Sequence, residues 1–290
     1  MTMKSGRILL TLPLGAALAA AAALLAVSCR TPPPAVTFPR GSREEPARSG
    51  PEAEAAFDRA ILWKPLPGHA SAGLTRVWAP LFLQESSEQT VHSTADLSVF
   101  SHEDRLVVGG WERPQVFYIW RRGASAPGHH SGTSPGWQGF RIVLGNLGQA
   151  LLWETLAEGT EPAHLYVARH WEEAAERTWG SPSPPRRFAV ETAAATGPGA
   201  RARVVEVFDD APMPMGPIVH VTAGGRIAWL VCRCAPSRVR QLVGQRFYEL
   251  RPLAEALTAT EGAERVPLPG TPAWLGAAEL ERLLHWVPGL

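Results

Sequence analysis

Sulfur-bearing side chains are concentrated in one short stretch of this chain. Beyond residue 29 the 290-residue sequence has only two methionines and two cysteines, Met213, Met215, Cys232 and Cys234. Thiolates and thioethers are the ligands that suit Cu(I). The stretch therefore allows a Cu(I) site or a thiol redox pair. It equally allows ordinary packing of cysteine and methionine in a core, or a disulfide formed in an oxidising compartment.

The spacing of these residues also predicts how they face one another. If Gly224 and Gly225 form a two-residue hairpin turn, Cys234 lies opposite Met215 on one face of the hairpin. His220 then lies opposite Trp229 on the other face, which argues against a zinc site that combines histidine with both cysteines. A Cys232–Cys234 disulfide would need a bend at the residue between them, because extended residues two apart lie near the limit for such a bond. Of these alternatives we expect the packed one.

Histidine gives one further candidate. His170 and Glu173 are three residues apart, so on a helix they would share a face and could hold a metal ion. No third ligand is fixed by spacing. Glutamates at a helix start are also favoured by the helix dipole, so a purely structural role competes with the metal.

Several classes of chemistry are missing. There is no Gly-Lys phosphate-binding loop, no Ser-x-x-Lys and no His-Glu-x-x-His in the sequence. Basic and acidic residues number 28 and 27, without a basic block, which argues against a nucleic-acid partner. We therefore expect no catalytic site and no cofactor, with Cu(I) as the alternative.

The N-terminus carries an export signal. Lys4 and Arg7 precede an apolar run over residues 8–27, and Cys29 follows after Ser28. The run resembles a bacterial lipoprotein signal peptide, whose cysteine is acylated and becomes the new N-terminus. The resemblance covers residues 1–29 and implies that Cys29 is the lipid anchor, carrying a fatty acid such as palmitate. An uncleaved membrane span and an ordinary cleaved signal peptide are the alternatives, and all three place the rest of the chain outside the cytoplasm.

The remaining chain divides into a tether and a folded part. Residues 29–56 hold the anchor cysteine and a proline-rich segment with few large apolar groups, which predicts a disordered tether. Residues 57–290 are long enough for a large core, with a possible internal boundary near residues 180–200. The predicted organisation is thus a signal peptide over 1–28, a lipidated tether over 29–56 and a globular domain over 57–290.

The globular part is predicted to be an α+β fold, mainly antiparallel β hairpins with a few inserted helices and a C-terminal helix. Hairpins are expected over residues 139–156, turning at Gly145–Gly148, and over 217–234. A helix is expected over Trp171–Trp179 and another from Pro272 to the C-terminus, whereas residues 238–251 fit a helix or a strand. Further strands are expected over residues 74–84, 96–101, 105–108, 115–121, 164–168, 187–191 and 201–208.

Together these observations predict a lipid-anchored protein of the bacterial cell envelope with a non-catalytic binding or structural role. Its partners would be the membrane, through the anchor, and an envelope protein. The alternatives are an envelope protein that handles Cu(I) or exchanges thiols through the four sulfur residues, and an envelope enzyme of another kind.

Overall fold

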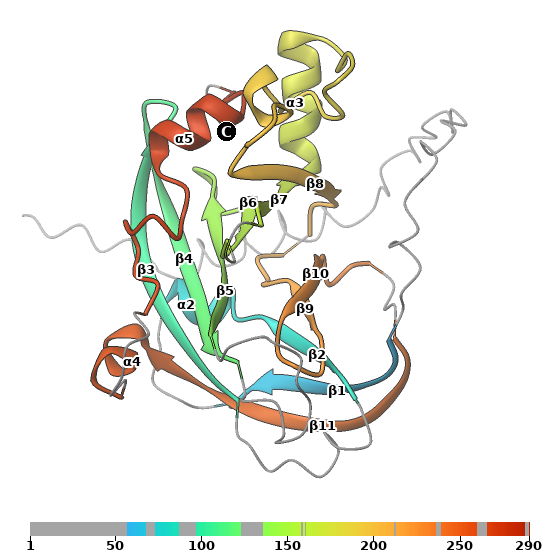
Figure 1. Ribbon diagram of the computed structural model, residues 1–290, viewed down its shortest axis with the longest axis vertical. Coiled ribbons are helices and arrows are strands. Elements are labelled where there is room, and N and C mark those ends of the chain that lie inside the picture. Colours follow the sequence, from blue (N-terminus) through green and yellow to red (C-terminus); the bar gives the residue numbers. More distant parts are fainter. Residues whose placement is uncertain are drawn as a thin grey trace, which may run out of the picture. The chain divides into compact units, whose positions relative to one another are not determined.

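Figure 1 shows the computed structural model, which describes residues 57–67, 73–86, 97–122, 136–157, 159, 161–211, 213–235, 239–259, 266–287 and 290. The predicted signal peptide, the anchor residue Cys29 and the predicted tether lie outside the described residues. Within the described part of the chain, no helix has both the length and the apolar character to cross a bilayer.

Eleven strands form one sheet in the order β10-β9-β2-β1-β11-β3-β4-β5-β6-β7-β8. β4 and β5 are buried over most of their length on both faces, which explains their nearly continuous apolar runs. The strands are β1 (Phe57–Pro65), β2 (Leu81–Glu85), β3 (Ser98–Val108), β4 (Trp111–Arg121), β5 (Trp137–Leu144), β6 (Ala150–Thr155), β7 (Ala163–Ala168), β8 (Ala202–Phe208), β9 (Ile218–Val221), β10 (Ile227–Val231) and β11 (Val239–Pro252).

The prediction of a strand-rich fold with few helices is confirmed, but the sheet is mixed rather than mainly antiparallel. β1 pairs in parallel with β11, and so do β11 with β3, β2 with β9, and β7 with β8. Parallel neighbours need a long connection instead of a tight turn, so they leave no local turn signal in the sequence. The two predicted hairpins have such a signal, and so does the hairpin of β3 and β4, which turns at Gly109 and Gly110 (φ 61° and 77°) and was not predicted.

Both predicted hairpins are present. In each, a three-residue loop ends in a glycine with positive φ, Gly148 (77°) between β5 and β6 and Gly225 (82°) between β9 and β10. The second loop is thus one residue longer than expected. An irregularity in β10 restores the predicted register, so that His220 pairs with Trp229.

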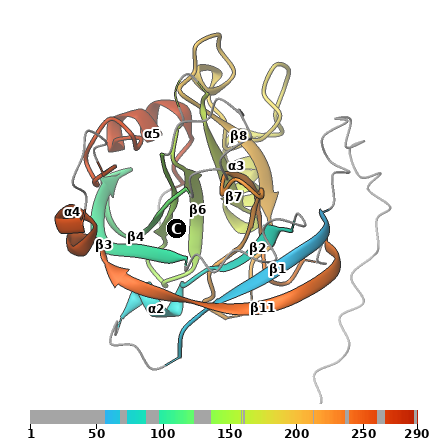
Figure 2. The ribbon, with the colours of Figure 1, turned by 60° about the horizontal axis from the view of Figure 1, so that its bottom comes forward.

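The sheet curls into an almost closed ring, as Figure 2 shows. β10 is one edge of the sheet, and side chains of the opposite wall bind its free backbone groups. The backbone N–H of Ile227 donates to Oε1 of Gln138 (3.3 Å), and that of Leu230 donates to the hydroxyl of Tyr166 (3.3 Å). These bonds protect an edge that would otherwise be open to pairing with another chain.

The helices are α2 (Leu74–Val77), α3 (Arg169–Trp179), α4 (Leu253–Ala259) and α5 (Ala277–Leu283), with a 3₁₀ turn at Ala193–Ala195. α3 confirms its prediction, and Gly180 ends it with a φ of 81°. The C-terminal helix is shorter than predicted. Residues 74–84 form α2 and β2 rather than one strand, residues 187–191 make only an isolated bridge, and the ambiguous segment 238–251 is β11.

Both faces of the central strands are buried. Tyr118 and Phe140 belong to the large core inside the curled sheet, whereas Phe117 and Ile119 belong to a second core on the outer face. Trp274 and residues of α4 complete that outer core. Residues 180–200 connect α3 with β8, which pairs with β7 in the same sheet.

Candidate functional site

A pocket of about 240 Å³ lies where β8 and β10 end and where the loop between β8 and β9 passes. Its walls bring together residues that are far apart in the sequence. Its lining residues include Met213, Met215 and Cys232, three of the four sulfur-bearing residues, together with His170. The sequence offered these residues as two unrelated candidates.

Aromatic rings form much of the apolar wall. Trp153 of β6 stacks on Phe208 at the end of β8, with ring centroids 3.8 Å apart and planes 2° from parallel. Trp78, which follows α2, is buried and lines the same pocket. A pocket with such walls favours an apolar surface in the bound molecule.

Gly216 fixes the methionine segment against this wall. A Cβ atom at this position would lie 2.0 Å from the carbonyl oxygen of Trp78, so only glycine fits without moving the backbone. The chain therefore runs directly against Trp78 at the residue after Met215. Met215 is half-buried as a result, whereas Met213 is exposed at the pocket mouth.

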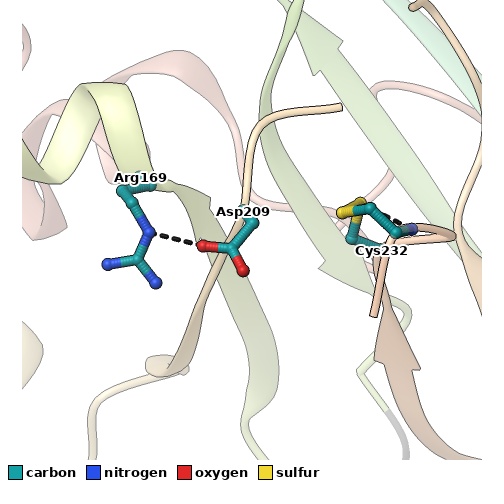
Figure 3. Close-up of a disulfide and its surroundings, with 4 residues drawn as sticks. Arg169, Asp209 and Cys232 are labelled. Carbon is teal, nitrogen blue, oxygen red and sulfur yellow. Dashed lines mark hydrogen bonds and ion pairs between the residues drawn. A yellow bond between two sulfur atoms is a disulfide. The ribbon is translucent and has the colours of Figure 1, made fainter. Parts of the chain in front are cut away.

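The start of α3 meets the residues that follow β8 (Figure 3). The Nε of Arg169 donates to Oδ1 of Asp209 (2.5 Å), and Nδ1 of His170 lies 2.5 Å from Oδ1 of Asp210. The backbone N–H of His170 also donates to Oδ2 of Asp210 (3.2 Å). Because the N-cap residue of α3 has no side chain that caps it, Asp210 supplies the acceptor that the helix start lacks.

This contact leaves the other ring nitrogen of His170 in an unusual state. The Nε2 atom is buried and has no hydrogen-bond partner among the described residues. A carboxylate on Nδ1 favours the tautomer that carries its proton there, so that Nε2 keeps its lone pair. The ring is therefore oriented by Asp210, and its Nε2 atom could accept a hydrogen bond or bind a metal ion.

The cysteines form a disulfide, one of the two alternatives to the packed thiols that we expected. Their Cα atoms are 5.2 Å apart, and the chain bends at Arg233 as such a bond requires. Cys232 is buried and lines the pocket, whereas Cys234 is exposed and lies outside it. Figure 3 shows the disulfide on the far side of Asp209 from Arg169.

Arg233 brings a positive charge to the same wall. One of its terminal nitrogens donates to the carbonyl oxygen of Ala79, while its Nε has no partner among the described residues. Burial lowers the pKa of the Arg233 guanidinium, and burial likewise raises the pKa of the nearby Tyr118 hydroxyl.

His170 and Glu173 both lie on α3, but only His170 lines the pocket. Glu173 is exposed and does not line the pocket, and Asp210 takes the place beside His170. Asp209 and Asp210 appear in the sequence only as turn residues. Their place beside His170 could be predicted only from the parallel register of β7 and β8. That register pairs Ala168 with Phe208 and so brings residues 169–170 beside residues 209–210.

Neither a cluster of metal-binding side chains among the described residues nor a related protein indicates what this pocket binds. Within the described residues no group of three or more histidine, cysteine, aspartate and glutamate side chains could hold a metal ion. No protein-family model, curated protein or solved structure matches the chain. The chemistry of the pocket must therefore be argued from its own residues.

Proposed function

We propose that this chain is a lipid-anchored binding protein of the bacterial envelope, and that the pocket beside Trp78 and Trp153 takes its ligand. The observation that carries the proposal is the composition of that pocket. Apolar and aromatic walls gain roughly 25 cal/mol for each Å² of apolar ligand surface that they remove from water. The few polar groups at one side, His170 and Arg233 among them, can orient the bound molecule.

The anchor is the second part of the proposal. Cys29 carries the lipid, and residues 30–56 tether the folded part, which leaves it free to reach ligands in the envelope. Cys29→Ser should abolish incorporation of labelled palmitate and block processing of the precursor. Labelling that persists in this variant, or that never occurs in the parent, contradicts the anchor.

The pocket is tested with a neutral fluorescent probe, N-phenyl-1-naphthylamine, whose emission rises in apolar surroundings. The parent chain should bind it, and Ala211→Phe, which adds a ring to the pocket wall, should lower the affinity about tenfold, equivalent to about 1.4 kcal/mol. Ala193→Phe is the matched control, because Ala193 is exposed on the 3₁₀ turn and does not line the pocket. Equal binding by both variants contradicts the proposal.

A second candidate function, thiol–disulfide exchange, is favoured by the unequal exposure of the two cysteines. An incoming thiolate can reach Cys234 and form a mixed disulfide, which releases Cys232 as a thiolate that takes up a proton. Equilibration in glutathione buffers of defined potential, followed by alkylation and mass spectrometry, tests this. A bond that stays oxidised at the potential of the envelope contradicts an exchange role.

A further inference from the structure

The strongest further feature of the molecule is the meeting of His170 with the two methionines in one pocket. We propose that His170, Met213 and Met215 form a site for a soft monovalent cation, Cu(I) or its analogue Ag(I). The proposal rests on the proposed function, because it names a ligand class for the same pocket. It differs from a thiolate copper site, since the cysteines play no part in it.

Two features suit the imidazole of His170 to binding a metal ion. Asp210 binds Nδ1 and also accepts the backbone N–H of His170, so both the ring and the residue that carries it are fixed. The second nitrogen is buried without a partner among the described residues, a state that costs free energy unless something binds there. A histidine that ligates a metal through one nitrogen typically donates the other to a carboxylate.

The course of the chain brings both thioether residues into the pocket that His170 lines. Met213 and Met215 are the only methionines beyond residue 3, and both line the pocket that His170 lines. Pro214 between them restricts the backbone, and Gly216 presses the segment against the carbonyl group of Trp78. The two sulfur atoms therefore belong to a segment whose path is set by contact with the pocket wall.

The donor set selects the kind of cation. One neutral imidazole and two neutral thioethers add no negative charge, and soft sulfur donors favour Cu(I) over Mg²⁺, Ca²⁺ or Mn²⁺. The carboxylates that a hard cation would prefer are occupied, since Asp209 pairs with Arg169 and Asp210 with His170. The disulfide removes Cys232 and Cys234 as thiolate ligands.

The test uses the full chain in detergent with its disulfide intact. Cu(I), kept reduced with ascorbate, is offered in competition with the chromogenic chelator bathocuproine disulfonate, and Ag(I) uptake is measured by calorimetry. The parent should withdraw one equivalent of either ion. Met213→Leu with Met215→Leu, which keeps side-chain volume and apolar character, should lower the affinity at least tenfold.

The matched control is Glu173→Gln on the same helix, which should keep the uptake of the parent because Glu173 is exposed and does not line the pocket. Cys232→Ser with Cys234→Ser tests the thiolate alternative. Uptake that is lost in the double serine variant but kept in the double leucine variant overturns the proposal in favour of thiolate ligands. A parent chain that takes up neither ion also overturns the proposal. Thermal unfolding of each variant shows whether it is folded, and His170→Gln gives a second variant that should lose uptake.

The naphthylamine probe separates failure of this inference from failure of the proposed function. Probe binding without cation uptake by the parent leaves the ligand pocket standing and refutes the cation site. Cation uptake that depends on the methionines, without probe binding, refutes the wider apolar-ligand proposal and supports the cation site alone.

Discussion

Two side-chain pairs that each contain a carboxylate differ sharply in their surroundings. Glu154 pairs with Arg141 between β5 and β6, where the two side chains are 0% and 2% exposed. Asp210 pairs with His170 at the pocket, where the side chains are 43% and 26% exposed. The first pair lies beneath the C-terminal segment, and the second lies beside an open pocket.

The interior pair is saturated with hydrogen bonds. Arg141 donates Nε to Glu154 (2.7 Å), Nη1 to Oε1 of Gln115 (3.0 Å) and Nη2 to the carbonyl oxygen of Leu275 (2.6 Å). Glu154 in turn accepts the backbone N–H of Leu275 (2.8 Å). Every nitrogen of the guanidinium group has a partner in the protein, so the network holds the C-terminal segment to the sheet and leaves little to bind a ligand.

The pair at the pocket is incomplete by comparison. Asp210 orients one nitrogen of His170, and the other nitrogen stays without a partner among the described residues. A satisfied buried pair stabilises one structure, whereas an oriented group with a free lone pair keeps capacity for a ligand. The difference supports the proposal that the second pair serves a ligand, whereas the first pair holds the fold together.

The largest effect is expected from breaking the interior pair. Glu154→Gln leaves the Arg141 charge buried without its counter-ion, which should cost about 3–5 kcal/mol of unfolding free energy. Glu112→Gln is the matched control, because the pair of Glu112 with Arg105 is exposed and such pairs contribute about 1 kcal/mol or less. Urea denaturation measures both. Similar losses in the two variants would show that the interior pair is not the structural element that we describe.

A smaller effect should follow from disturbing the pair at the pocket. Asp210→Asn should lower the affinity for Ag(I) about 10-fold to 100-fold, the usual effect of removing a carboxylate that orients a ligating histidine. Asp209→Asn, one residue earlier, loses only its contact with Arg169 and should bind Ag(I) as the parent does. Calorimetry compares the two variants. Equal losses of affinity would mean that general charge, not orientation of His170, matters here.

The smallest effect concerns a histidine away from both pairs. His285 stacks on Trp179, with ring centroids 4.7 Å apart, and burial followed by the charge of Arg186 lowers the pKa of its imidazole. The folded state thus favours the neutral ring, and the unfolded state takes up the proton more readily. Stability should fall slightly as the pH drops below about 6.5, the unfolded value.

The control for this pH effect is His285→Phe, which keeps an aromatic ring on Trp179 but cannot titrate. Its unfolding free energy at pH 7 minus that at pH 5 should be smaller than the difference measured for the parent. A variant with the same pH dependence as the parent would assign the loss of stability to other groups.

Local signals predicted local structure well. The turn glycines Gly148 and Gly225 located both predicted hairpins, and the pattern of α3 located its end before Gly180 and its start to within about two residues. The predicted pairing of His220 with Trp229 is also present, although the loop is longer than expected and an irregularity in β10 restores the register.

The rest of the fold depends on contacts between distant segments. Nothing near β1 in the sequence indicates that it pairs in parallel with β11. Glutamates at the start of α3 were expected to interact with the helix dipole, and the Glu172 carboxylate also accepts the backbone N–H groups of Ala189 and Val190. Likewise the contact of His170 with Asp210 could not be predicted, because Asp210 follows a strand that is adjacent only in space.

The most direct test of the account is a crystal structure of the chain loaded with Ag(I), with the cation located by its anomalous scattering. The account predicts one strong peak in the pocket, bound by Nε2 of His170 and by the sulfur atoms of Met213 and Met215. A peak on Cys232 and Cys234, or the absence of any peak near His170 at saturating silver, would contradict it.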